Sequence, residues 1–130
     1  MKEKIDSLRE IFMLLPTWSE RYNYLIELGE QLPEMPVAFQ VPENRIECNS
    51  MIYFHVCYIN DICYIFATAN SPIPAGLSGL LFSLCDNTSK KELSENLPYL
   101  LDTLNEIGLI DNLTPARRDA FLSMIKKIAL

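Results

Sequence analysis

Cys48 is the residue with the clearest capacity for chemistry, because it stands among small hydrogen-bonding side chains in the stretch Asn44–Tyr53. This stretch directly precedes the strongest strand pattern of the chain. Pro33, Pro36 and Pro42 keep the preceding segment irregular, since each fixes φ and lacks a backbone donor. A thiol in such a loop can reach another molecule, and its thiolate can attack sulfur or bind a metal. The alternative interpretation is that Cys48 is a loop cysteine with no function.

The other cysteines and the histidine offer few further candidates for a catalytic or metal-binding site. The four cysteines lie at positions 48, 57, 63 and 85, without a C-x-x-C pair, and His55 is the single histidine. Zinc and iron–sulfur motifs need closely spaced pairs, so we expect no metal centre. A Cys-His enzyme is possible in principle. However, His55 lies inside a predicted strand without an evident orienting partner, which favours a structural role.

Length and charge limit the classes of protein to which the chain can belong. The chain has 130 residues, of which 49% are hydrophobic and 22% charged, as expected for a single globular domain spanning 1–130. The N-terminus is charged, and no apolar run approaches the roughly 20 residues that span a bilayer. We therefore expect a cytoplasmic protein with reduced thiols and no membrane contact. The net charge of −6 also makes nucleic acid an unexpected partner, whereas a protein partner is not excluded.

The N-terminal third is predicted to be helical. Apolar residues recur at three- and four-residue spacing over 2–15, which indicates an amphipathic helix that ends before Pro16. Thr17 and Glu20 form a capping box that opens a second helix, from Trp18 to about Gln31. We expect these two helices to form a helical hairpin.

A β-hairpin is predicted in the middle of the chain. Residues 51–59 and 62–69 are rich in β-branched and aromatic side chains, and Asn60-Asp61 suits a two-residue turn. This turn pairs Cys57 with Tyr64 and Cys63 with Tyr58, so the two cysteines lie on opposite faces and should not bond to each other. Residues 45–47 are a candidate third, edge strand. Both faces are apolar, which suggests that helices cover much of the sheet.

The C-terminal half is predicted to be mostly helical. A loop over 68–75 leads into a buried apolar helix over 76–85, and a capping box at Ser89 opens a short helix to about Leu97. Pro98 is expected to restart a helix, and Thr114-Pro115 to begin the last one. The last helix should turn four side chains inward: Phe121, Leu122, Ile125 and Ile128. The predicted fold is α+β, with a small antiparallel sheet of about three strands packed against several helices.

Four blocks of the sequence resemble the SufE/CsdE family. They are Trp18–Pro33, Asn44–Tyr53, Ala75–Leu77 and Leu113–Arg117, which occur in family order and with family spacing over nearly the whole chain. A single block would be weak support, whereas all four together are specific. The family fold, a small antiparallel sheet packed on helices, agrees with the order of elements predicted above.

The resemblance implies a sulfur acceptor rather than a stand-alone enzyme. Cys48 would take sulfane sulfur as a persulfide from a PLP-dependent cysteine desulfurase of the SufS/CsdA type, stimulate that enzyme, and pass the sulfur to an iron–sulfur cluster scaffold. The protein itself would need no cofactor, since the PLP chemistry belongs to the desulfurase. The residues expected to support Cys48 are Asn44, Arg45, Glu47, Asn49, Ser50, Gly76 and Arg117.

Several positions depart from the family pattern. The family usually has Gly at position 47, Trp at 53 and Lys at 75, and its loop after the hairpin is acidic, whereas this chain has Thr68–Asn70 there. A left-handed conformation at Glu47 would cost roughly 1–2 kcal/mol. The carboxylate of Glu47 should also oppose the Cys48 thiolate, unless Arg45 and Arg117 offset it. The alternative function is therefore a binding-only regulator of a desulfurase with weak or no sulfur relay. A cluster scaffold is disfavoured by the cysteine spacing.

Overall fold

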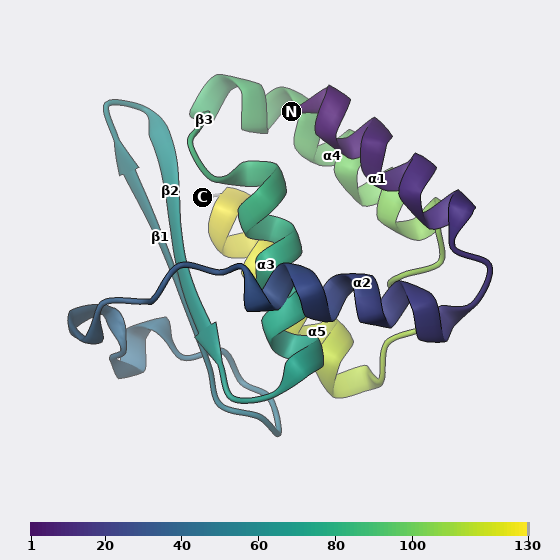
Figure 1. Cartoon of the computed structure of the whole chain (residues 1–130). Helices are drawn as coiled ribbons and strands as arrows, with labels where there is room; N and C mark the ends of the chain where they lie inside the picture. The colour runs from purple at the N-terminus through teal and green to yellow at the C-terminus, as the bar shows by residue number, and fades with distance from the viewer. Residues whose placement is uncertain (130) are drawn as a thin grey trace.

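The computed structural model describes residues 1–129 and confirms the α+β fold. Within that range it contains five α-helices and a three-stranded antiparallel sheet of order β1-β2-β3. All five helices lie on one side of the sheet, and two short 3₁₀ turns lie on the other side (Figure 1). The elements in chain order are α1 (Lys2–Leu14), α2 (Trp18–Glu30), η1 (Val37–Phe39), η2 (Pro42–Asn44), β1 (Ile52–Ile59), β2 (Ile62–Ala69), α3 (Pro72–Cys85), β3 (Thr88–Ser89), α4 (Lys90–Glu106) and α5 (Pro115–Ala129).

The β-hairpin has the predicted register. Asn60 and Asp61 both adopt positive φ, at 51° and 63°, as a tight two-residue turn requires. Cys57 pairs with Tyr64 and Tyr58 with Cys63, so the two cysteines lie on opposite faces. The third strand is not where it was predicted: β3 pairs with the start of β2, whereas Arg45 makes only an isolated bridge to Tyr53.

Helices cover one face of the sheet rather than both. On the inner face Ile52, Phe54 and Ile65 are buried against the helices. The outer face is covered in part by η1, whose Phe39 ring stacks on His55 at 4.4 Å and lies 4.9 Å from the Phe66 ring. Helices thus cover much of the sheet, as expected, but only on its inner face, because an irregular segment supplies the outer layer.

The central helix α3 begins earlier than predicted. Ser71 is its N-cap, and Pro72 occupies the first turn, where an amide hydrogen is not needed. The prolines that favoured a loop over 68–75 therefore open the helix. α3 crosses α2 closely, since a Cβ at Gly76 or Gly79 would lie 2.5 Å from a carbonyl oxygen of α2.

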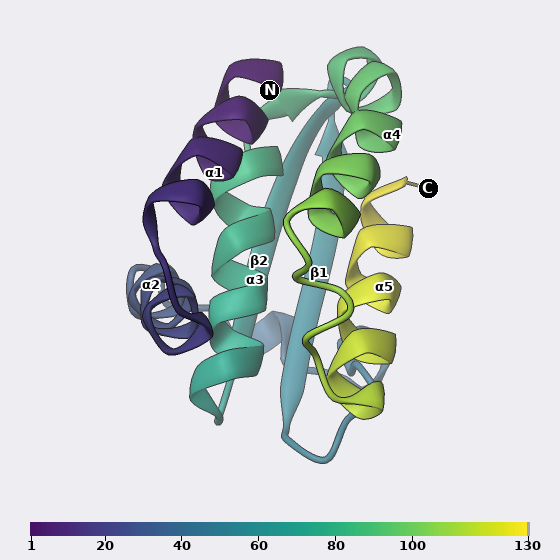
Figure 2. The same cartoon turned by 90° about the vertical axis from the view of Figure 1, so that its right-hand side faces the viewer.

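The predicted helical hairpin of α1 and α2 was wrong. α1 packs along α4, and α2 packs across α3 (Figures 1 and 2). Arg9 ties α1 to α4 by donating to Tyr99 Oη at 2.8 Å and to Thr103 Oγ1 at 3.0 Å. The Thr17 cap is present, with the Glu20 amide donating to Thr17 Oγ1 at 3.2 Å, but it turns the chain away from α1.

Two further helical predictions need correction. Pro98 does not interrupt α4, because both Pro98 and Ser94, whose carbonyl loses its usual partner, lie on the exposed face. The buried leucines of α4 continue on its other face through Leu104. In α5, Leu122 is 38% exposed, whereas Phe121, Ile125 and Ile128 are buried as predicted.

The outer backbone groups of both long strands have partners along part of their length. Beside β1, the Ile46 amide donates to the Ile52 carbonyl at 3.0 Å, and Lys127 Nζ donates to the Phe54 carbonyl at 3.2 Å. Beside β2, the Ile65 amide donates to Asp86 Oδ1 at 2.9 Å. Further along β2, the segment 32–34 passes next to the strand (Figure 1).

Candidate functional site

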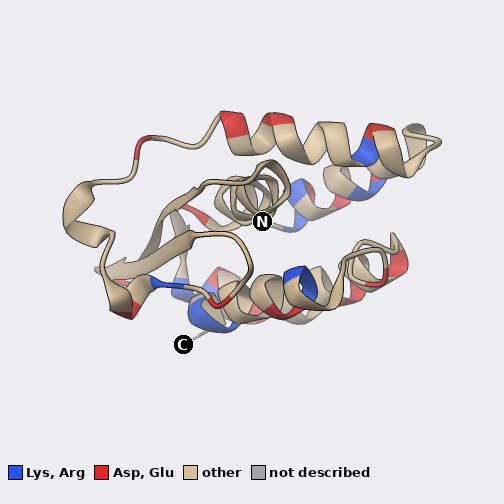
Figure 3. Ribbon diagram, turned by 90° about the horizontal axis from the view of Figure 1, so that it is seen from below, with Lys and Arg blue, Asp and Glu red and all other residues tan. Residues whose placement is uncertain are grey.

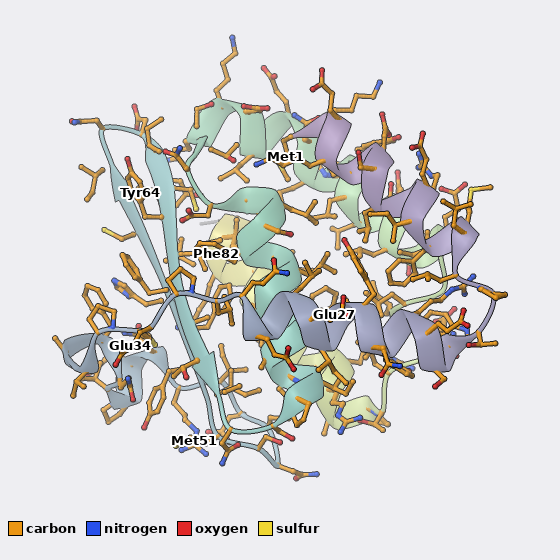
Figure 4. All side chains as sticks on the ribbon, in the orientation of Figure 1. Met1, Glu27, Glu34, Met51, Tyr64 and Phe82 are labelled. Atoms are coloured by element: carbon orange, nitrogen blue, oxygen red, sulfur yellow. The ribbon has the colours of Figure 1, made fainter. Side chains whose placement is uncertain are left out.

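Cys48 lies in a short loop between the Arg45 bridge and the start of β1. The loop projects at the end of the molecule where Met51 is labelled in Figure 4. The Cys48 side chain is half-buried and packs against the edge of the core. Its Sγ lies 4.0 Å from the Ala116 carbonyl in the first turn of α5. The thiol is thus held near the start of the last helix.

Hydrogen bonds hold both ends of the Cys48 loop. At its start, the Ile46 amide donates to the Ile52 carbonyl. At its end, the Met51 amide donates to Asn70 Oδ1 at 2.9 Å, and the Asn70 amide donates to the Met51 carbonyl at 3.1 Å. Asn70 was not identified from the sequence as a site residue. The only indication of its role was that an Asn just after a strand can hydrogen-bond nearby backbone groups.

Asn44 holds the segment that leads into this loop in place. The residue is buried, and its Nδ2 donates to the Phe39 carbonyl at 2.8 Å. Its Oδ1 lies 3.2 Å from His55 Nδ1, so the imidazole donates to it. Burial and the nearby Lys127 ammonium lower the pKa of His55. His55 therefore has the structural role that was expected.

The charged residues of the predicted site are arranged around the loop. Glu47 is exposed, and it is not among the described residues with positive φ, so the anticipated backbone strain does not arise. Arg45 is also exposed, with its guanidinium carbon 6.0 Å from the centre of the Tyr53 ring. Arg117 directly follows Ala116 in the first turn of α5. Acidic and basic residues are interspersed when the molecule is seen from below (Figure 3).

The remaining predicted site residues differ in their surroundings. Asn49 is exposed and Ser50 half-buried, as members of the loop itself. Gly76 instead lies at the crossing of α3 with α2, where a Cβ would meet the Leu25 carbonyl oxygen at 2.5 Å. The contacts of Gly76 therefore give it a role in helix packing.

The other three thiols have different environments. Cys57 is half-buried on the outer face of the sheet, whereas Cys63 and Cys85 are both 0% exposed. Burial raises the pKa of Cys63 to about 11 and that of Cys85 to about 12. Among residues 1–129, no three His, Cys, Asp or Glu side chains are placed to hold a metal ion.

We expect iodoacetamide to distinguish these thiols in the folded protein. At pH 8, only about one Cys63 or Cys85 thiol in a thousand or fewer would be ionised, and the thiolate is the reactive form. Peptide mapping by mass spectrometry should therefore find label on Cys48 and Cys57 first, and on all four cysteines after unfolding. Equal labelling rates in the folded protein would contradict the burial described here.

We expect Asn70→Ala to loosen the Cys48 loop. The substitution removes the acceptor for the Met51 amide and should cost about 1 kcal/mol. Hydrogen exchange at that amide should become faster, and Cys48 alkylation with it. Asn70→Asp is the matched control, because it keeps an oxygen acceptor at the same position and should retain the protection. Equal exchange in the two variants would show that the side chain does not hold the loop.

Fold and site together define a small α+β domain that holds a half-buried cysteine in a loop fixed at both ends. Residues 6–130 match the SufE family, which is described as an Fe-S metabolism associated domain. The chain therefore belongs to the SufE family, as the four sequence blocks predicted.

Individual relatives agree with this assignment. A SufE-like protein of Rhizobium meliloti is 29% identical over 95% of this chain and 91% of its own length. A second, from Rhizobium etli, is 27% identical over 95% of this chain and 86% of its own length. A solution structure of a hypothetical protein from Thermus thermophilus has the same fold, with a TM-score of 0.68 at 21% identity, covering 96% of this chain and 93% of that one. In the part of the chain that the structure describes, no helix is long and apolar enough to cross a membrane.

Proposed function

We propose that this protein accepts sulfur from a PLP-dependent cysteine desulfurase on Cys48 and relays it to an iron–sulfur cluster scaffold. The observation that carries the proposal is the position of Cys48 in a SufE-family chain: it lies in a projecting loop, while Cys63 and Cys85 are fully buried. SufE membership suggests a desulfurase as the partner. Transfer within a protein complex would proceed in the cytoplasm, where the thiols stay reduced.

The transfer step needs only thiol chemistry. The Cys48 thiolate attacks the terminal sulfur of the donor persulfide, a new S–S bond forms on Cys48, and the old S–S bond breaks. The electron pair of the broken bond leaves with the donor cysteine as its thiolate, so no outside oxidant or reductant is required. Cys48 then carries a persulfide that a second acceptor can attack in the same way.

The geometry of the Cys48 loop supports this role, because the ends of the loop are fixed while the thiol can turn outward. The contact between Cys48 Sγ and the Ala116 carbonyl keeps the thiol half-buried in the free protein. To react, the thiol has to leave that carbonyl and turn outward. Because the loop ends are fixed at Ile46 and Met51, the residues between them can move while the sheet and α5 stay in place. A docked desulfurase would stabilise the outward position.

Mass spectrometry of the intact chain and its peptides tests the proposal. The protein is incubated with a SufS-type desulfurase and cysteine, without reductant, and each cysteine peptide is examined for added sulfur. We expect one added sulfur atom, ~32 Da, on the Cys48 peptide and none on the Cys63 and Cys85 peptides. Sulfur that never reaches Cys48, although the desulfurase turns over, would overturn the proposal.

The alternative is a regulator that binds a desulfurase without relaying sulfur. The inward position of the Cys48 thiol and the exposed carboxylate of Glu47 beside it favour this second function. A changed desulfurase rate without added sulfur on Cys48 would support the regulator. The same incubation therefore separates the two functions.

We expect Glu47→Gln to increase the reactivity of Cys48. Removing the exposed negative charge next to Cys48 lessens its repulsion of the anionic reagent iodoacetate, and a solvent-exposed charge of this kind changes such a rate by about two- to fivefold. The measurement is the rate of Cys48 alkylation at neutral pH. Glu43→Gln is the matched control, since it removes an exposed carboxylate of the same segment that is not adjacent to Cys48. Equal rates in all three proteins would show that Glu47 does not influence the thiol.

A further inference from the structure

A second concave site lies beside the middle of β2, and none of the residues that line it belongs to the Cys48 loop. Its volume is about 250 Å³, and the residues that line it include Leu32, Pro33, Phe66 and Phe82. These residues come from the segment after α2, from β2 and from α3. Glu34, Tyr64 and Phe82, which also line the site, are labelled in Figure 4. We call this site the β2 pocket.

The charges of the β2 pocket have one sign. Glu34 and Asp86 line it, and its lining contains no Lys or Arg. Asp86 accepts the Ile65 amide through Oδ1, which leaves its second oxygen for another donor. The ion pairs within residues 1–129 use Asp6, Glu92 and Glu106 instead. The pocket therefore combines apolar lining residues with two carboxylates that form no ion pair with a cation of residues 1–129.

The pocket suits a side chain better than a strand or a large ligand. Small-molecule sites usually measure roughly 300–1,000 Å³, and this pocket is smaller. Addition of a strand to β2 is obstructed, because the segment containing Pro33 and Glu34 passes next to that edge. A long aliphatic stem that ends in a positive charge fits both the apolar walls and the carboxylates, since the stem packs on the walls while the cation contacts the carboxylates.

We propose that the β2 pocket binds an arginine or lysine side chain presented by an exposed segment of a partner protein. Phe66 and Phe82 line the pocket, and aromatic side chains can bind a cation or its aliphatic stem. Charge complementarity selects the partner, because the pocket is acidic and the whole chain carries a net charge of −6. This proposal does not depend on sulfur relay, so either can fail without the other.

Amide spectra of the ¹⁵N-labelled full chain test the proposal, with acetyl-arginine amide as the first probe and acetyl-citrulline amide as its neutral isostere. We expect a saturable change in the amide signals of residues 64–67 and Phe82 with the arginine probe only. High salt should weaken it, because the carboxylates are partly screened. A capped peptide with one arginine between alanines should bind at a lower concentration than acetyl-arginine amide, as expected for a protein segment.

Variants show whether the two carboxylates cause the binding. Glu34→Gln and Asp86→Asn should each weaken it by about two- to fivefold. Asp86→Asn keeps an oxygen acceptor for the Ile65 amide, so the fold is preserved. Glu30→Gln is the control, since it removes a carboxylate that does not line the β2 pocket, and binding should be unchanged.

Four results would overturn the proposal. The first is an equal response to the citrulline probe, and the second is unchanged binding in both carboxylate variants. The third is a peptide that binds no better than acetyl-arginine amide, which would indicate a small free cation rather than a protein segment as the ligand. The fourth is a change in the same signals with protein concentration alone, which would identify a second copy of the chain as the occupant.

Discussion

Cys48→Ser is expected to abolish sulfur uptake while leaving the fold intact. Serine is nearly isosteric with cysteine, and the Ala116 carbonyl, 4.0 Å from Sγ, leaves room for its hydroxyl. The melting temperature should therefore stay within a few degrees, since a conservative change at a half-buried position costs little. The hydroxyl is not ionised at neutral pH and cannot form a persulfide, so transfer should fall below detection.

The measurement combines desulfurase turnover with mass spectrometry of the cysteine peptides. Cys57→Ser is the matched control, because Cys57 is the other half-buried thiol and lies on the outer face of the sheet. The control should keep both sulfur uptake and stimulation of the desulfurase. Persulfide on Cys57 in the Cys48→Ser protein, formed as fast as on Cys48 in the natural chain, would contradict the assignment of Cys48.

Gly76→Ala is expected to give a large loss of stability. The new Cβ would lie 2.5 Å from the Leu25 carbonyl oxygen and 2.7 Å from its carbonyl carbon, so the backbones of α2 and α3 would have to separate. Overpacking usually costs about 1–3 kcal/mol, and contact with backbone atoms places this change at the upper end, about 3 kcal/mol. The gain of ~1 kcal/mol from alanine in a helix offsets part of the cost. We expect a net loss of about 2 kcal/mol, or roughly 6–12 °C in melting temperature.

Thermal and urea unfolding of Gly76→Ala would measure this loss. Ser83→Ala is a suitable control on the same helix, because Ser83 is exposed and its hydroxyl donates only to the Leu80 carbonyl of α3 itself. Its free energy of unfolding should change by no more than about 0.5 kcal/mol. A Gly76→Ala protein as stable as this control would mean that the α2–α3 crossing is looser than described.

Local patterns predicted the local structure well. The register of β1 and β2 follows from the two-residue turn at Asn60-Asp61 and from alternation along the strands, both of which are properties of neighbouring residues. The caps at Thr17, Ser89 and Thr114 were also predicted, and their hydroxyls accept the expected amides. Such features depend on residues three positions apart, so the sequence alone specifies them.

The wrong sequence predictions concern features that are determined by tertiary packing. Pro72 was placed in a loop and Pro98 at a helix boundary, yet the first opens α3 and the second lies on the exposed face of α4. The third strand was assigned to 45–47 because that segment precedes β1, whereas Thr88–Ser89 reaches β2 from across the fold. A hairpin pattern cannot show which distant segment completes a sheet.

The candidate site was only partly predictable for the same reason. Cys48 was found from its neighbours and from the family resemblance. Asn70 bonds Met51 from 19 residues away and Ala116 contacts Cys48 from 68 residues away, and no local pattern indicates such contacts. The resemblance placed Gly76 in the site by position, whereas the structure shows that it permits two helices to cross.

The protected edges of the small sheet have a consequence for the behaviour of the protein in concentrated solution. A strand with free backbone groups is a template for the stacking of further chains, and aggregation commonly begins there. Here Lys127 and the Ile46 amide occupy positions along β1, while Asp86 and the segment containing Pro33 lie along β2. These contacts occupy backbone groups that a further strand would need, so they oppose edge-to-edge pairing of the apolar, β-branched hairpin with another copy.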